Sequence, residues 1–326
     1  MWRALGIKVA ISLKRGCVNC KADKIKRYDI TALGYCSIDH LCLIPKVPED
    51  DKVEISELLI SGGGPAATAA ITAARLGAST AYLGAIGDDE NGKQILKDLK
   101  KENVQVSGVM IRPGAISPAA YCWVEGNTGK RSIAWSRGSV KALRVKEVKK
   151  ELICSSRILL LDGHHPEAAI RAAKLAKKYG TKVLLDGGTF RPHMKDLMDL
   201  SDVVIASEVF ARQMTGSNDV KCALMKIYAY GPEWAVITLG AKGSLAYDGK
   251  KFFAQKSFKI NVVDTTGAGD VYHGAFAYKY LACKDLAEIM RFSSAVAAMK
   301  CRKLGGRNGI PKINSVEDFM RQRAPA

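Results

Sequence analysis

The second half of the chain alternates between short, fully apolar runs and longer segments with helical spacing. The apolar runs are Ile158–Leu161, Val183–Leu185, Val203–Ala206 and Ala235–Thr238. Between them, Glu167–Lys178 and Glu208–Met214 repeat apolar residues every three or four positions, which is typical of helices packed on one face. Continuous apolar strands that alternate with helices predict an α/β, doubly wound fold, with a mostly parallel sheet and helices on both faces.

Polar residues follow several of these runs directly. The carboxyl ends of parallel strands share one edge of a sheet, and ligands collect there. The residues predicted at this edge are Asp39, Asp162, His164, Asp186 and Gly240. Asp39 follows an earlier apolar run, Ile30–Ser37, which we interpret as a buried strand; a turn or helix cap is the alternative role for its carboxylate.

Four shorter segments in the first half have the pattern of exposed strands. Val53–Ile60 alternates apolar and polar residues, and Gln105–Ile111, Ala119–Val124 and Arg131–Ala134 are separated by turns rich in glycine. A glycine triplet, Gly62-Gly63-Gly64, precedes Pro65 and an alanine-rich helical pattern. Glycines here would let a ligand lie on the backbone, although a lone triplet is more often only a loop.

The most informative stretch is Val263-Asp264-Thr265-Thr266-Gly267-Ala268-Gly269-Asp270. It predicts a strand end and a tight turn that opens a helix through Tyr278, with the amides of Gly267 to Asp270 as unpaired donors for an anion. A carboxylate at Asp270 would be repelled by a bound phosphate, unless it accepts a proton from an incoming hydroxyl. The stretch therefore indicates phosphoryl transfer; the alternative is a plain turn and an acidic helix start.

Composition narrows the possible classes of protein. The chain has 326 residues, 48% hydrophobic and 25% charged, which is typical of a globular protein, and no uncharged apolar run is long enough to span a membrane. Its nine cysteines are an odd number and are scattered, which favours free thiols in a cytoplasmic protein. Cys17 and Cys20, or His164 and His165, could bind a metal, but neither pair has further ligands nearby.

The net charge of +18 raises the question of nucleic-acid binding. No run of five or more Lys and Arg occurs, and much of the excess lies on predicted helix faces such as Lys174–Lys178. Binding to polyanionic nucleotides is the simpler interpretation, and nucleic acid stays an unfavoured alternative. Residues 1–28 form a basic segment without sustained periodicity, which we interpret as a mobile N-terminal extension; a transit-like peptide or a misplaced start codon are the minor readings.

Asp264-Thr265-Thr266-Gly267-Ala268-Gly269-Asp270 resembles the C-terminal signature of the ribokinase-like (PfkB) carbohydrate kinases. The stretch from Gly62 to Gly92, with Leu83-Gly84-Ala85-Ile86-Gly87-Asp88, resembles their N-terminal signature. The resemblance runs from about Asp29 to Ile310. It implies one kinase domain over residues 29–326, with a small β lid whose strands fall at about 40–60 and 106–135.

The resemblance also implies roles for individual residues in an ATP-dependent sugar kinase. Asp270 would be the general base, with Gly267, Ala268 and Gly269 in the anion hole. The sugar would meet Asp39, Gly62, Gly63, Gly64, Lys52 and His164. ATP would meet Thr238, Gly240, Lys242, Gly243, Thr265 and Glu208. Magnesium is the expected partner of ATP, and in some relatives a monovalent cation lies near the turn that here is Leu304–Gly309.

The sequence departs from the family pattern at one motif. Many relatives carry Asn-x-x-Glu after the strand that corresponds to Val203–Ala206, and use it to organise magnesium and phosphate. Here Ser207 and Phe210 take those two positions, which leaves the metal ligands unknown and Glu208 as the nearest carboxylate. The departure keeps open a non-catalytic sugar or nucleotide sensor as an alternative.

The substrate is the least defined property. The sequence is similar to sulfofructose kinases around Asp270 and from Gly305 to Pro311, yet His164 and Pro113 stand where that group places an Arg and an Asn for the sulfonate. We therefore favour an uncharged ketose or a related sugar. A nucleoside kinase is a further alternative, because Tyr121, Trp123 and Trp135 supply aromatic groups. The resemblance also implies a homodimer through the lid, while the absence of a long apolar run predicts no membrane partner.

Overall fold

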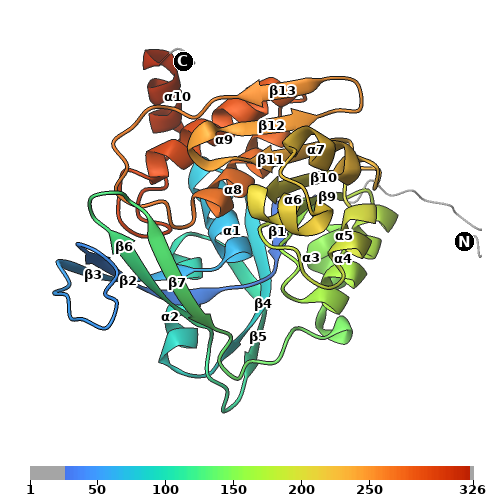
Figure 1. Ribbon diagram of the computed structural model, residues 1–326. Helices are drawn as coiled ribbons and strands as arrows, with labels where there is room; N and C mark the ends of the chain where they lie inside the picture. The colour runs from blue at the N-terminus through green and yellow to red at the C-terminus, as the bar shows by residue number, and fades with distance from the viewer. Residues whose placement is uncertain (1–25, 324–326) are drawn as a thin grey trace, which may run out of the picture.

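The computed structural model describes residues 26–323 and divides the strands between two sheets (Figure 1). The larger sheet has nine strands in the order β13-β12-β11-β10-β9-β8-β1-β4-β5, and neighbours from β11 to β5 are parallel. Its strands are β1 (Tyr28–Leu33), β4 (Thr80–Gly87), β5 (Gln105–Arg112), β8 (Ser156–Leu161), β9 (Lys182–Gly187), β10 (Val203–Ser207), β11 (Trp234–Thr238), β12 (Ser244–Tyr247) and β13 (Phe252–Gln255).

Helices cover both faces of this sheet, as the alternation of strands and helices predicts. One face is covered by α1 (Pro65–Leu76), α2 (Glu90–Lys101), α8 (Ala268–Tyr280), α9 (Leu286–Lys300) and α10 (Ile313–Gln322). The other is covered by α3 (Lys150–Cys154), α4 (Pro166–Lys178), α5 (Met194–Asp199), α6 (Glu208–Thr215) and α7 (Val220–Tyr228). Two short 3-10 helices, Val145–Glu147 and Gly240–Lys242, complete the described part of the chain.

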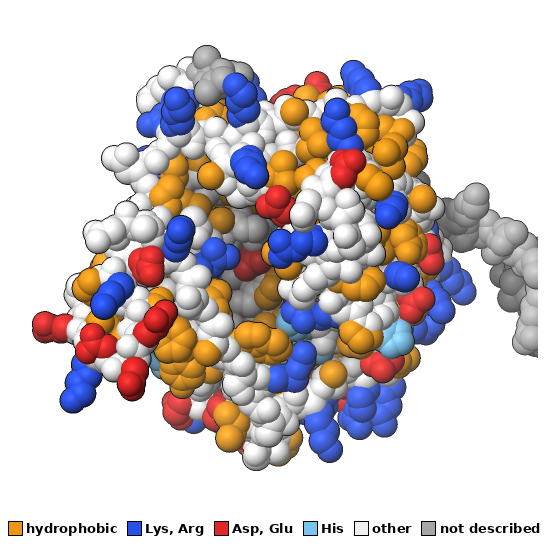
Figure 2. Space-filling view, in the orientation of Figure 1, with side chains coloured by type: hydrophobic (Ala, Val, Ile, Leu, Met, Phe, Trp, Pro, Cys, Tyr) orange, Lys and Arg blue, Asp and Glu red, His pale blue; other side chains and the backbone are white. Residues whose placement is uncertain are grey.

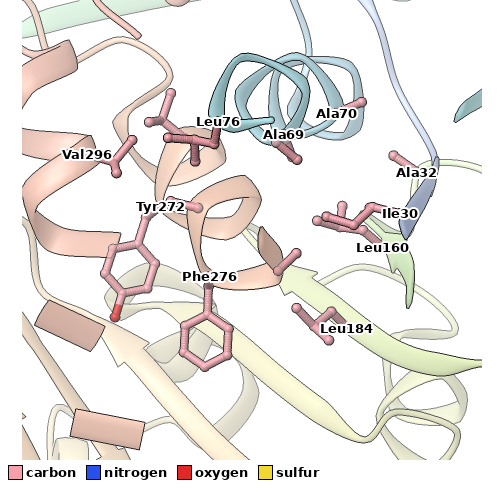
Figure 3. Close-up of a cluster of buried hydrophobic side chains, with 14 of the residues drawn as sticks. Ile30, Ala32, Ala69, Ala70, Leu76, Leu160, Leu184, Tyr272, Phe276 and Val296 are labelled. Atoms are coloured by element: carbon pink, nitrogen blue, oxygen red, sulfur yellow. The ribbon is translucent and has the colours of Figure 1, made fainter. Parts of the chain in front are cut away.

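Successive side chains of each apolar strand point alternately into the two hydrophobic cores, one on each face of the large sheet. On β8, Leu160 packs toward α1 and α8, whereas Leu159 and Leu161 pack toward α4. Figure 3 shows the first core, where Phe276 of α8 lies near Leu184 of the sheet. Burying each such side chain stabilises the fold by about 1.5–3 kcal/mol. A strand buried on both sides must be apolar at every position, and this is why these runs could be recognised in the sequence.

The second sheet forms the lid, with the order β3-β2-β6-β7. Its strands are β2 (Ser37–Ile44), β3 (Glu57–Gly63), β6 (Ala119–Glu125) and β7 (Arg131–Ser136). Because side chains alternate along each strand, the register places Asp39, Arg131 and Trp135 on one face, the face that also carries the buried Leu41 and Cys122. That face is turned toward the large sheet, so the lid brings these three side chains to the candidate active site.

Two expectations about strands were wrong, one for a lid strand and one for the first strand of the large sheet. The segment 106–112 is not a lid strand, because β5 pairs with β4 at the edge of the large sheet. The apolar run Ile30–Ser37 is not one strand: β1 ends at Leu33, and the Tyr35 amide donates to Oδ2 of Asp162 at 2.7 Å where the chain leaves the sheet. Asp39 therefore lies within lid strand β2, not at the end of a strand of the large sheet.

The chain ends bear on two further expectations. The predicted N-terminal extension, residues 1–28, lies mostly outside the described residues, but its last part belongs to the fold. Lys26 donates to the carbonyl oxygens of Cys154 and Tyr179 at 3.1 and 3.2 Å, and Tyr28 begins β1. Within residues 26–323, no helix is both long enough and apolar enough to cross a membrane.

Candidate active site

The N-terminus of α8 follows the tight turn that the sequence predicts, and a buried carboxylate organises this turn. The predicted strand end before the turn is wrong, because β13 ends at Gln255 and residues 256–263 are neither strand nor helix. Gly267 precedes the helix with φ 71°, a left-handed conformation that favours glycine, and a side chain there would also press against Gly306. Asp264 is fully buried; its Oδ1 accepts the Thr266 amide at 2.7 Å and its Oδ2 accepts the Gly305 amide at 2.8 Å. This carboxylate therefore ties the predicted phosphate turn to the glycine-rich turn 304–309.

Lys300, a residue that sequence reasoning missed, completes this arrangement. Its side chain is fully buried at the end of α9, and its ammonium group donates to the Asp264 carbonyl oxygen at 2.9 Å and lies 3.8 Å from the Asp264 carboxylate. Burial lowers the pKa of Lys300, and the charge of Asp264 opposes that shift. The only signal in the sequence was a lysine closing a largely apolar helix.

Three amides of the turn are free to bind an anion, one fewer than expected. The Ala268 amide donates to the Thr265 carbonyl oxygen at 3.2 Å, because the chain turns tightly enough to close that bond. The amides of Gly267, Gly269 and Asp270 have no acceptor within the described residues. A side chain added at Gly269 would meet no protein atom within 4 Å, so open space lies beside the helix terminus.

Asp270 has an unusual protonation equilibrium. Its residue is half-buried in the first turn of α8, and burial raises the pKa of its carboxyl group to about 7. The nearby carboxyl of Asp186 contributes to the rise, while His273 and Arg131 oppose it. A carboxylate with a pKa near neutrality is a stronger base than an ordinary one, yet is still largely ionised above pH 7.

Asp186 and His273 form a buried pair next to Asp270. Oδ2 of Asp186 lies 3.2 Å from Nδ1 of His273, and Nε2 of His273 lies 3.1 Å from the Ile205 carbonyl oxygen. Burial raises the pKa of Asp186 to about 8 and lowers the pKa of His273. We therefore assign Nε2 as the donor to Ile205, while Oδ2 of Asp186 and Nδ1 of His273 face each other without a hydrogen bond within the described residues.

The predicted sugar-binding residues meet where β2 and β3 of the lid approach the start of α1. Asp39 is buried, and Oδ1 of its carboxyl accepts the Ser37 hydroxyl at 2.6 Å. A Cβ atom on Gly63 would lie 2.0 Å from Oδ2 of Asp39, so only glycine leaves room for this carboxyl group. Gly64 has φ 89° immediately before Pro65, the first residue of α1.

Arg307 also reaches this corner and was not singled out in the sequence. It is buried, its Nη2 donates to the Gly63 carbonyl oxygen at 2.6 Å, and its Nε donates to the Thr68 hydroxyl at 3.1 Å. Its Nη1 lies so close to Gly62 that a Cβ there would be 2.1 Å from it. The Gly-Gly-Arg sequence at 305–307 was the available signal, but nothing local showed that the arginine points into the protein.

The lid closes on the phosphate turn through Arg131. Its Nη1 donates to the Thr265 hydroxyl at 2.8 Å, and that hydroxyl lies 3.3 Å from the Gly129 carbonyl oxygen, to which it donates. Thr265 was expected to contact ATP; in this structure its hydroxyl holds the lid. The pair is 134 residues apart in the sequence, so no local pattern could reveal it.

His164 and Lys52 have different surroundings. His164 is buried after β8, and its ring stacks on Tyr35 with centroids 4.6 Å apart. His165 instead binds backbone, with Nδ1 accepting the Leu143 amide and Nε2 3.1 Å from the Gly34 carbonyl oxygen. Lys52 is exposed in the loop between β2 and β3, which extends outward from the lid in Figure 1.

The predicted nucleotide turn follows β11. Thr238 ends that strand beside Ser207, and Gly240–Lys242 form a 3-10 turn that leads into β12 as a hairpin. The Ser244 hydroxyl lies 3.1 Å from the Tyr272 hydroxyl, which fixes this hairpin to α8 near Asp270. Gly243 and the exposed Lys242 thus lie next to residues that contact α8.

The departure from the family motif has a structural explanation. The Ser207 hydroxyl accepts the Phe210 amide at 2.9 Å and caps α6, while Phe210 is fully buried against Phe190. Glu208 is exposed on the first turn of α6. In residues 26–323 no group of three or more His, Cys, Asp or Glu is arranged to hold a metal ion.

The space-filling view shows a hollow in the surface beside the lid. Figure 2 shows the molecule hollowed between the lid and the larger unit, with acidic side chains on the floor and basic and histidine side chains along one rim. The model of the pfkB family of carbohydrate kinases matches residues 28–313. The chain belongs to this family. It is a carbohydrate kinase, an ATP-dependent phosphotransferase with a ribokinase-like fold.

Individual relatives agree with the family assignment and differ in their sugars. Ribokinase from Haemophilus influenzae is 29% identical over 304 residues, covering 90% of this chain and 99% of the relative. 5-Dehydro-2-deoxygluconokinase from Bacillus licheniformis is 27% identical, covering 90% of this kinase and 96% of the relative. The structure of Arabidopsis thaliana ribokinase complexed with ribose and ATP has a TM-score of 0.78 at 26% identity, and covers 90% of this kinase and 98% of that chain.

Proposed function

We propose that this kinase transfers the γ-phosphate of ATP to a hydroxyl group of a small sugar, with Asp270 as the general base. The observation that carries the proposal is a half-buried carboxyl group with a pKa of about 7, at a helix N-terminus with free amides, in a chain of this family. The acceptor sugar would lie between Asp39, the triplet Gly62–Gly64 and the inner face of the lid.

The chemistry follows from these positions. Asp270 takes the proton of the acceptor hydroxyl, and the hydroxyl oxygen attacks the γ-phosphorus in line. The bond from that phosphorus to the β,γ-bridging oxygen breaks, and ADP leaves. The free amides of Gly267, Gly269 and Asp270 stabilise the charge on the transferring group. Magnesium, when bound with ATP, neutralises charge on the phosphates.

The nucleotide would bind along the hairpin turn at the end of β11. Thr238, Gly240, Lys242 and Gly243 form this turn, and Lys242 is exposed, so its ammonium group is free to meet the phosphates. Glu208, at the start of the neighbouring α6, would offer a carboxylate to the magnesium bound with ATP. Thr265 would exchange its hydrogen bond with Arg131 for one with ATP when the lid opens.

The outer face of the lid supports a homodimer. Leu58, Ile60 and Tyr121 lie on that face by register and are 60%, 56% and 50% exposed. Apolar side chains on one side of a four-stranded sheet are a surface that a second copy of the same sheet would cover. Light scattering after gel filtration tests this proposal, and a monomer at all protein concentrations would contradict it.

ADP release with Mg-ATP, across a panel of ketoses, aldoses, sugar acids, nucleosides and sulfofructose, tests the proposed function. One clear acceptor establishes the kinase and its substrate class, and a nucleoside acceptor would favour the nucleoside kinase alternative. The buried Phe210 in place of a carboxylate is the observation that favours a sensor. A sensor would bind ATP or sugar and release no ADP with any member of the panel.

A further inference from the structure

Two arginines from separate segments lie near His164, at one end of the proposed sugar site. Arg137 follows β7 of the lid, and its Nη1 donates to the His164 carbonyl oxygen at 3.5 Å. Its guanidinium carbon lies 5.7 Å from the centre of the Tyr35 ring. Arg191 comes from the loop after β9, and the charges that act on it include those of Arg137 and Asp162. The two guanidinium groups therefore share one neighbourhood.

Aromatic rings form a shelf beside these arginines. Tyr35 stacks on His164, and Trp135 of the lid meets both rings edge-on, with centroids 5.8 and 6.2 Å away. Trp135 is 51% exposed although it lies on the inner face of the lid. A flat, partly exposed aromatic surface of this kind suits the apolar face of a sugar.

The positive charge of Arg191, beside these aromatic rings, has no carboxylate that fully neutralises it. Within residues 26–323 the Arg191 guanidinium makes no hydrogen bond and no ion pair, and burial lowers its pKa. Asp162 is the first carboxylate that acts on it, but its oxygens already accept the backbone amides of Tyr35, Ala66 and His164. Asp186 is the second, and its raised pKa, about 8, keeps it largely neutral at pH 7.

A buried nitrogen at the same place also lacks a partner. Nδ1 of His164 is buried and has no hydrogen-bond partner within the described residues, and His164 as a whole is only 8% exposed. A buried polar atom without a partner destabilises the folded protein, because it has lost its hydrogen bonds to water. That loss is offset when a ligand supplies the missing partner. The free nitrogen and the two arginines thus call for the same kind of group, one that carries oxygen atoms and negative charge.

We propose that Arg137, Arg191 and His164 bind a carboxylate or sulfonate group at one end of the acceptor, so that the kinase phosphorylates an acidic sugar. The proposal rests on the proposed function and names its substrate class. Guanidinium groups match the oxygens of such groups through paired, charge-assisted hydrogen bonds. Asp186 lies 3.2 Å from His273 of α8 and acts electrostatically on both Arg191 and Asp270, so the acid group and the reacting hydroxyl would lie on either side of this carboxyl group.

This inference replaces the uncharged ketose favoured by the sequence. That preference rested on His164 and Pro113 standing where an Arg and an Asn were expected. The structure brings a positive charge to the same pocket from other segments, the end of β7 and the loop after β9. A purely structural role for Arg137, through its contact with the Tyr35 ring, is the competing explanation.

The test compares matched acceptors by ADP release with Mg-ATP. The pairs are fructose with 6-deoxy-6-sulfofructose, and glucitol with gluconate; fructose 6-phosphate adds a doubly charged acceptor. We expect the acidic member of one pair to have a kcat/KM about 100-fold above its neutral partner, the size expected of charge-assisted hydrogen bonds. The preferred pair distinguishes sulfonate from carboxylate. Equal use of neutral partners, or preference for the phosphate, would overturn the proposal and leave the kinase function standing.

Variants separate binding from packing. Arg137→Gln and Arg191→Gln should each raise KM for the acidic acceptor about 10- to 100-fold and change kcat/KM for its neutral partner little. Arg137→Lys keeps the charge but cannot form the paired hydrogen bonds, so its KM for the acidic acceptor should lie between those of the parent and Arg137→Gln. Arg171→Gln, on the exposed face of α4, is the matched control and should change neither value. Equal losses with both members of a pair would indicate a structural role.

A binding measurement that needs no turnover separates the acid-site proposal from the kinase proposal. If no acceptor releases ADP, the shift in melting temperature on adding gluconate or sulfofructose is compared with that for glucitol or fructose. A shift confined to an acidic compound and lost in Arg191→Gln supports the acid site while the kinase proposal fails. Absence of both turnover and such a shift contradicts the acid site.

Discussion

The pKa of Asp270 makes a quantitative prediction about the pH dependence of catalysis. As the proposed general base, Asp270 would accept the proton of the acceptor only when ionised, so kcat/KM should follow the ionised fraction of the free enzyme. With a pKa of about 7, that fraction is about one-tenth at pH 6, about half at pH 7 and about nine-tenths at pH 8. kcat/KM should therefore rise about tenfold from pH 6 to pH 8 and fall away as the pH drops.

The assay is initial-rate ADP release at saturating Mg-ATP, with the acceptor varied at each pH. Asp270→Asn is the control, since its residual activity should lose this rise. Asp186→Asn leaves burial, the largest cause of the raised pKa of Asp270, in place, and Asp186 is itself largely neutral near pH 7 because its pKa is about 8. The pH profile of this variant should therefore move little. A flat parent profile from pH 5.5 to 8 would refute the reasoning, because an Asp with an ordinary pKa of about 3.9 is fully ionised throughout that range.

The raised pKa of Asp270 also predicts how the stability of the folded protein changes with pH. Asp270 has a higher pKa in the folded state than in the unfolded state, so folding favours its protonated form. The stability that this provides is present at low pH and is lost as the pH rises through about 7. Asp270→Asn, which is neutral throughout, should therefore melt at a higher temperature than the parent at pH 8, with a difference that shrinks toward pH 5.

Three further changes test other parts of the site. Gly63→Ala places a Cβ atom 2.0 Å from the Asp39 carboxyl and should raise the acceptor KM at least about tenfold, whereas Gly126→Ala, in the roomier lid turn, should not. Lys300→Met leaves the buried Asp264 carboxylate without its cation and should cost about 3–5 kcal/mol of unfolding free energy in denaturant titration, with loss of activity. Chelation of magnesium should abolish ADP release reversibly; activity that persists in excess chelator would contradict the expected role of the metal.

The sequence predicts the large sheet well because its strands are buried on both faces. Val203–Ala206 and Ile158–Leu161 had to be apolar at every position, and the helices between them had to show one apolar face. The lid strands were harder to predict, because they are half-exposed. Their apolar and polar residues alternate in the same way as in an edge strand of the large sheet. That ambiguity explains why 106–112 was assigned to the wrong sheet.

The active-site turn could be predicted from its local sequence, but its partners could not. Gly267 and Asp270 act within one tight turn, so their spacing carries the information. Lys300 and Arg131 reach the turn from segments that are distant in the sequence, through contacts that only the folded chain creates. The position of Arg191 near His164 could not be predicted either, because it depends on where β9 lies in the sheet.

Replacement of the general base tests the central claim most directly. Asp270→Asn should lower kcat for the best acceptor by about 10²–10⁴-fold, the usual share of a general base, while the Kd for Mg-ATP measured by calorimetry stays within about twofold. Asn keeps the size of the side chain and the backbone donor of the turn, so the loss isolates proton transfer. Turnover unchanged in this variant, with ATP and acceptor still bound, would contradict the assignment of Asp270 and the mechanism built on it.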